Sequence, residues 1–160
     1  MRKRSKYRPK GVLIDTLSHV ITGMHRVGSI GAGTTLKIKN YDALNAVRKG
    51  TGGRDDIDVL IGALNMAEAL ARMKIGDDWK VEIRAAQDAL FAVGSRGAET
   101  GKFILRGPEL IALNLGMEIH DAQLDACTIS ELEKAMDIVN SDVRHHKARP
   151  LVVKEKANAN

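Results

Sequence analysis

The feature that most constrains the fold is the spacing of apolar residues between Asp56 and Val139. They return every three or four positions, which is the repeat of a helix with one buried face. The first such stretch opens at Asp55-Asp56, ends at Gly76 and places these residues on one face: Ile57, Leu60, Ile61, Leu64, Ala67, Ala71 and Ile75. A second runs from Trp79 to an expected end at Gly94. Because the turn between them is so short, we expect an antiparallel helical hairpin.

Two further helices are expected towards the C-terminus. Pro108 suits the first turn of a helix that would run to about Ala126. Thr128 and Glu131 then have the Thr-x-x-Glu spacing of a capping box, which predicts the start of a final helix. Cys127, between these two helices, is expected to be a small buried residue.

The N-terminal third is less regular. A short helix is expected over 12–24, and the glycine-rich segment 28–35 is expected to form a loop. The alternation over 36–39 resembles a strand, and Asn40 is a suitable N-cap for a short helix over 41–49 that Gly50 would end. A second glycine-rich connection is expected over 95–107.

Together these patterns predict an all-α protein, a compact bundle of about five or six helices. Only 3% of the residues are aromatic, so aliphatic side chains and methionine must fill the core. We expect a basic N-terminal arm over 1–10, a helical domain over 11–143 and a basic polar tail over 144–160.

Charge is distributed unevenly along the chain. The first ten residues hold six Lys or Arg and no acid, residues 55–143 hold eight Lys or Arg against seventeen Asp or Glu, and residues 144–160 are basic again. A run as short and as charged as 1–10 is expected to act on an anionic partner rather than to fold alone. Lys and Arg bind nucleic acids by neutralising phosphates and releasing counterions.

The leading hypothesis is therefore a non-enzymatic regulator that binds DNA or RNA through the arm. Phosphate contacts are assigned to Arg2, Lys3, Arg4, Lys6, Arg8 and Lys10, with Tyr7 placed to stack on a base or sugar. A continuation of this basic patch is assigned to Lys37, Lys39, Arg48 and Lys49.

Three alternatives stay open. The protein could be an inhibitor that binds a host enzyme or a defence complex, with the acidic body imitating nucleic acid. It could assemble with itself by pairing its basic front with its acidic body, or the arm could be a solvated tail. The basic cluster Arg144–Arg149 could extend the nucleic-acid footprint, but cations at the end of a helix also complement its dipole.

The sequence contains no convincing catalytic, cofactor-binding or metal-binding motif. The glycines of 28–35 lack the strand and spacing of a dinucleotide site, and Gly97 to Lys102 is one residue short of a P-loop. Adjacent residues such as His145 and His146 make a poor metal pair on a helix. The acidic group Glu118, His120, Asp121 and Asp125 is expected to be a solvated surface. We expect neither cofactor nor enzyme activity.

A helix-turn-helix is disfavoured as well. Ala112 and Gly116 have the spacing of that motif, but the segment 118–125, which would have to read the major groove, is acidic.

Three features of the sequence indicate the cellular compartment of the protein. The chain has one cysteine, no apolar run approaching the roughly 18 residues of a membrane helix, and no convincing signal-peptide core. We expect a cytoplasmic protein that does not enter a membrane.

Two segments carry a resemblance to a known group of proteins. The start Arg-Lys-Arg-Ser-Lys-Tyr-Arg-Pro-Lys over 2–10, and His120-Asp121-Ala122-Gln123-Leu124 followed by Thr128 and Glu131, resemble small uncharacterised accessory proteins of temperate bacteriophages and prophages. The resemblance implies a protein of the bacterial host cytoplasm that binds DNA, modifies transcription or blocks a host or defence enzyme by occupying its surface.

Overall fold

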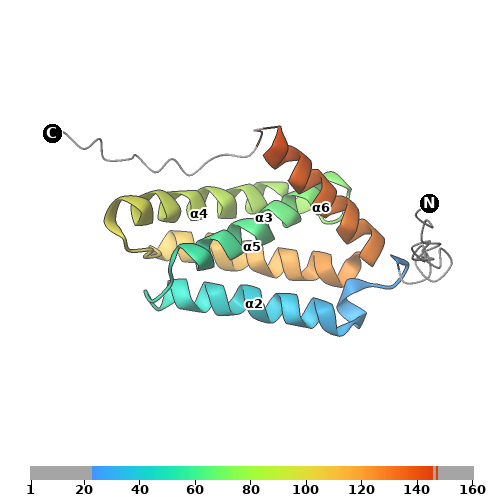
Figure 1. Cartoon of the computed structure of the whole chain (residues 1–160), viewed down its shortest axis with the longest axis horizontal. Helices are drawn as coiled ribbons and strands as arrows, with labels where there is room; N and C mark the ends of the chain where they lie inside the picture. The colour runs from blue at the N-terminus through green and yellow to red at the C-terminus, as the bar shows by residue number, and fades with distance from the viewer. Residues whose placement is uncertain (1–22, 146, 148–160) are drawn as a thin grey trace, which may run out of the picture.

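A computed structural model describes residues 23–145 and 147 of the chain (Figure 1). Its elements are η1 (Val27–Ser29), α2 (Gly31–Arg48), α3 (Arg54–Arg72), η2 (Asp77–Trp79), α4 (Lys80–Thr100), α5 (Gly107–Ala126) and α6 (Ile129–Arg144). Within this described part no β-strand forms, and one isolated bridge joins Arg26 to Thr128. The predicted all-α class is confirmed, while the arm 1–10 and most of the helix expected over 12–24 lie outside the described residues.

Helices α2 to α5 lie along the length of the molecule, and α6 crosses one end of them (Figure 1). The ribbon reverses direction at each connection from α2 to α5, so successive helices are antiparallel. The expected hairpin of α3 and α4 is confirmed, and Gly76 closes its turn with a left-handed φ of 74°.

The core has two main parts. Helices α2 to α5 enclose the first, where Ile57, Leu60, Leu64, Leu90 and Met117 are almost completely buried. The second lies where η1 and α6 pack against the ends of α3 and α5, and it includes Val27, Leu70, Leu124, Cys127 and Ala135. Cys127 is buried as expected.

The loop expected over 28–35 and the strand expected over 36–39 are wrong, whereas the helix expected over 41–49 is confirmed as the C-terminal part of a longer helix. The short helix η1 precedes α2, and α2 is continuous from Gly31 to Arg48. The buried positions Asn40, Ala43, Leu44 and Val47 follow the helical repeat, so Asn40 lies inside α2 instead of capping it. Gly33 is needed for packing, because a Cβ there would stand 2.4 Å from the Val27 carbonyl oxygen.

The expected end of the next long helix at Gly94 is also wrong. Helix α4 continues to Thr100 and ends at Gly101, whose φ is 73°. Gly94 and Gly97 are buried inside α4, and a Cβ at Gly97 would collide with the ring of Phe103. Contact with Phe103 therefore explains why a glycine stands at position 97 inside a helix.

The expected start of the last helix is confirmed. The Thr128 side chain accepts a hydrogen bond from the Glu131 backbone N–H, and the Glu131 carboxylate accepts one from the Thr128 backbone N–H. Pro108 lies in the first turn of α5, as expected. Gly116 lies in the middle of α5 with no turn beside it, which agrees with the rejection of a helix-turn-helix.

Candidate functional site

The four basic residues expected to extend a nucleic-acid patch all lie on α2 or at its end. Lys37 forms an ion pair with Asp125 of α5, with 2.7 Å between Nζ and Oδ1, so its charge is compensated within the protein. Lys39, Arg48 and Lys49 are exposed and form no ion pair with a described carboxylate. Lys37 thus differs from the other three residues in that its charge is paired within the protein. Arg2, Lys3, Arg4, Lys6, Tyr7, Arg8 and Lys10 lie outside the described residues.

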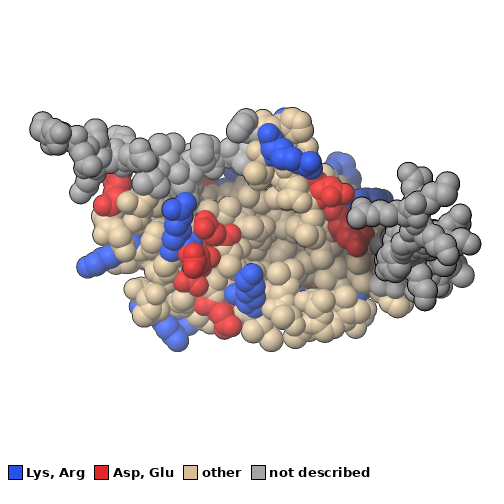
Figure 2. Space-filling model, in the orientation of Figure 1, with Lys and Arg blue, Asp and Glu red and all other residues tan. Residues whose placement is uncertain are grey.

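On the face shown in Figure 2, the described cations do not merge into one positive surface. Arg144 ends α6 on the opposite side of the bundle from α2 (Figure 1). Figure 2 shows Lys and Arg interspersed with Asp and Glu over the visible face. On this face the described residues therefore form no continuous positive surface from α2 to the end of α6.

A polar cluster lies between α2 and α5. His120 is buried, and burial together with the nearby charge of Lys37 lowers its pKa to about 4. Burial raises the pKa of the neighbouring Asp121, and burial raises the pKa of Tyr41 as well. His120 is therefore neutral near pH 7.

This arrangement corrects the expectation of a solvated acidic surface. Glu118 and Asp125 are exposed, but His120 is buried and Asp121 is half-buried. The Nδ1 atom of His120 and the Oδ1 atom of Asp121 are buried without a hydrogen-bond partner. His120 and Asp121 follow one another on a helix, so their side chains point in different directions and do not form an acid–base pair.

A groove of about 470 Å³ lies between α3, α4 and α6. Its apolar lining consists of Ile61, Leu64, Leu90, Phe91, Val139 and Val143. Its polar lining consists of Asn65, Glu68, Arg72, Arg84, Gln87, Asp142 and Lys147. On α3 the lining extends from Ile61 to Arg72, about 16 Å or three helical turns.

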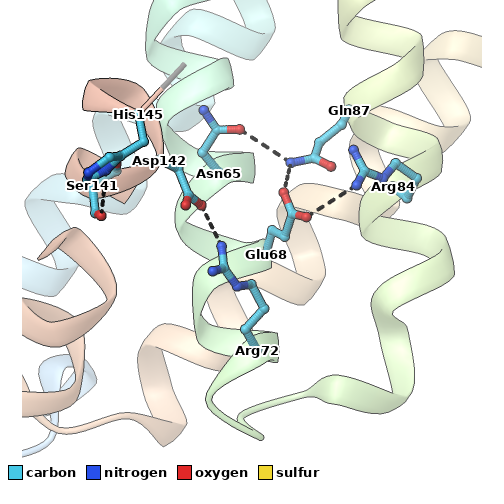
Figure 3. Close-up of polar contacts among 8 residues, drawn as sticks. All are labelled: Asn65, Glu68, Arg72, Arg84, Gln87, Ser141, Asp142 and His145. Atoms are coloured by element: carbon cyan, nitrogen blue, oxygen red, sulfur yellow. Dashed lines mark hydrogen bonds and ion pairs between the residues drawn. The ribbon is translucent and has the colours of Figure 1, made fainter. Parts of the chain in front are cut away.

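Polar contacts join the three helices around this groove (Figure 3). Gln87 of α4 donates from Nε2 to Glu68 Oε2 at 2.8 Å and to Asn65 Oδ1 at 3.3 Å, both on α3. Arg84 of α4 donates from Nη2 to Glu68 Oε1 at 3.3 Å. Between α3 and α6, Arg72 forms an ion pair with Asp142. These contacts link α3 to α4 and to α6 along the groove.

The cations of these pairs are more exposed than the carboxylates. The Arg84 side chain is 60% exposed against 38% for Glu68, and the Arg72 side chain is 49% exposed against 26% for Asp142. Lys147 on the groove and Lys80 on a smaller adjoining depression are also exposed. The cationic side chains at the groove are therefore more accessible to solvent than the carboxylates that they contact.

Sequence reasoning missed this groove. A signal existed on α3, where Ile61, Asn65, Glu68 and Arg72 follow the helical repeat and form a mixed apolar and charged stripe. No sequence pattern indicated that α6 would lie opposite this stripe.

Comparison with protein-family models, with curated proteins and with solved structures finds no match. Among the described residues, no group of three or more His, Cys, Asp or Glu is arranged to hold a metal ion. The helices described here include none with the length and apolar character required to cross a membrane.

Proposed function

We propose that this chain is a non-enzymatic binding protein that holds a segment of a partner protein in the groove between α3, α4 and α6. The observation that supports this most directly is the combination of an apolar lining with charged walls that carry ion pairs between helices. Peptide-binding grooves commonly combine apolar contacts, which supply affinity, with polar contacts, which set orientation.

The shape of the groove favours a protein segment. Its lining follows three turns of α3 and meets Val139 and Val143 on α6 across the opening. An amphipathic helix bound in a groove is recognised through apolar side chains spaced over a similar length. The resemblance to bacteriophage accessory proteins supports a bacterial host or defence protein as the partner, inhibited by occupation of its surface in the cytoplasm.

A peptide selection tests this function. Peptides recovered from a random library on the full chain are measured by fluorescence anisotropy against the wild type, Val143→Glu and Val81→Glu. Both valines are exposed on helices, but only Val143 lines the groove. We expect Val143→Glu to weaken binding at least about tenfold by placing a charge against apolar contacts, and Val81→Glu to have little effect. Equal binding to both variants, or recovery of no peptide, would overturn the proposal.

Nucleic-acid binding through the N-terminal arm is a second candidate function. It is supported by the six Lys or Arg residues among the first ten, together with exposed Lys39, Arg48 and Lys49. Contacts are assigned to Arg2, Lys3, Arg4, Lys6, Arg8 and Lys10. The ion pair between Lys37 and Asp125 removes Lys37 from this set.

A salt series separates the two candidates. Labelled DNA and RNA are titrated with the full chain and with a variant in which the six arm cations are replaced by Ser. Loss of phosphate contacts predicts weaker binding and a shallower dependence of affinity on salt. An unchanged affinity and slope would exclude the arm as a nucleic-acid site. Light scattering over the same salt range tests the remaining alternative of self-assembly.

A further inference from the structure

We infer that the segment held in the groove is an acidic amphipathic helix, with its apolar face on the groove floor and carboxylates towards the cationic rim. This inference rests on the proposed protein-binding function and adds the chemistry of the partner. It depends on three properties of the groove: its length, its apolar contacts and its unpaired positive charge.

The apolar contacts lie on both sides of the groove. Ile61 of α3 and Val139 and Val143 of α6 line the groove with side chains that are at least partly exposed. Leu64 and Leu90 also line it but are buried in the core. Three turns of a helix present apolar residues at spacings of three and four, which suits two lines of contacts along a groove of this length.

Both carboxylates that line the groove, Glu68 and Asp142, are already paired with cations. Glu68 accepts from Arg84 through Oε1 and from Gln87 through Oε2. Asp142 accepts from Arg72 through Oδ2. A basic partner segment would therefore compete with Arg72 and Arg84 for the same carboxylates.

Donor groups, in contrast, remain available. A guanidinium has five N–H groups. Arg84 uses Nη2 and Arg72 uses Nη1 in the contacts described above, and both side chains are about half exposed. Lys80 and Lys147 add two exposed ammonium groups that form no ion pair with a described residue. Charge complementarity therefore favours a partner that supplies carboxylates.

Three designed probe peptides test the inference. Each is a labelled amphipathic helix of about 15 residues with the same Leu and Ile face. The flanking positions carry Glu in the first probe, Lys in the second and Gln in the third. Fluorescence anisotropy measures binding to the full chain at low and at physiological salt. The Glu probe is expected to bind at least about tenfold more tightly than the Lys probe, with the difference shrinking as salt rises.

A pair of charge-reversal variants locates the effect. The double substitution Lys80→Glu and Lys147→Glu reverses the rim without breaking either ion pair of the groove wall. The control, Lys39→Glu with Lys49→Glu, makes the same change in net charge on α2. We expect the rim variant to lower the affinity for the Glu probe about fivefold or more. The control should change this affinity less than about twofold, because screening limits the effect of remote charges.

The outcomes distinguish this inference from the function on which it rests. Tighter binding of the Lys probe, or equal effects of rim and control variants, would overturn an acidic partner and leave the groove as a peptide site. Failure of the Val143→Glu test would overturn the function itself. Library peptides that bind at the groove but are not acidic would also overturn the inference alone.

Two other occupants of the groove give different results. If the chain's own C-terminal Leu151-Val152-Val153 filled it, replacing these three residues by Ser would strengthen binding of all three probes alike. If a second copy filled it, light scattering would show a dimer that Val143→Glu dissociates. Either result would overturn the inference.

Discussion

Gly116 of α5 faces Ala86 of α4 so closely that a Cβ added to Gly116 would stand 2.5 Å from the Ala86 Cβ. Both residues are buried where α4 and α5 pack. We expect Gly116→Ala to lower the free energy of unfolding by about 1–3 kcal/mol, because the added methyl forces the two helices apart. Urea denaturation checks this.

A second glycine gives the matched control. Gly62 lies in the interior of α3, where an added Cβ would meet nothing within 4 Å. Gly62→Ala should therefore raise the free energy of unfolding by about 0.5–1 kcal/mol through helix propensity. If both substitutions stabilise the protein, close packing at Gly116 is not what excludes a side chain there.

Arg96 and Glu109 predict an acid-dependent loss of stability. Arg96 donates from Nη1 to Oε1 at 2.7 Å and from Nη2 to Oε2 at 2.6 Å, and these bonds hold the pKa of Glu109 below its usual value. A carboxyl with a lowered pKa stabilises the fold above its ordinary pKa, and this contribution is lost as the pH falls through the folded-state value.

The substitution that tests this contribution is Glu109→Gln. We expect it to lower the free energy of unfolding by about 1–3 kcal/mol near neutral pH, since it weakens bonds to a charged group. The difference from the wild type should shrink at pH values below the ordinary glutamate range. A difference that is constant with pH would contradict the assigned role of Glu109.

The buried His120 should make the free energy of unfolding depend on pH at higher pH values than Glu109 does. Burial and the charge of Lys37 lower its pKa from an ordinary 6.5 to about 4. Between these two pH values the unfolded chain therefore binds a proton on His120 that the folded protein does not. The stabilising contribution of neutral His120 is complete above pH 6.5 and decreases as the pH falls towards 4, by up to about 3 kcal/mol.

His120→Leu should remove this dependence. Comparing the wild type and the variant by urea denaturation between about pH 6.5 and pH 5 avoids most of the carboxyl titration. The wild type should lose stability over this interval faster than the variant. Parallel losses would show that His120 is protonated in the folded protein.

The ion pair between Arg72 and Asp142 predicts a local effect on α6. Because Arg72 is half exposed, a double-mutant cycle with Arg72→Ala and Asp142→Ala should give a coupling energy below about 1 kcal/mol. Hydrogen exchange in the C-terminal half of α6 should nevertheless accelerate, since this pair joins that half to α3. The control Arg54→Ala removes a pair confined to α3 and should leave exchange in α6 unchanged.

Several elements were predictable because their signals are local. The periodic apolar residues of α3 and the reciprocal cap of Thr128 and Glu131 depend on residues a few positions apart. The prediction for the N-terminal segment was wrong because it also depended on local signals alone. Glycines at 31 and 33 and an alternating stretch over 36–39 have weak helix propensity, but packing of Asn40, Leu44 and Val47 against the core overrides it.

The amino-acid sequence by itself determined that this chain forms helices, where most of them begin, and which of their faces are apolar, because these properties arise from neighbours along the chain. Only the tertiary structure decided which face meets which. It made Gly97 and Gly116 contact points within helices, paired Lys37 with Asp125, and set α6 opposite α3 so that Arg72 and Asp142 meet beside a groove. The physical reason is that close packing and charge pairing join residues far apart in sequence, and local propensity contains no term for them.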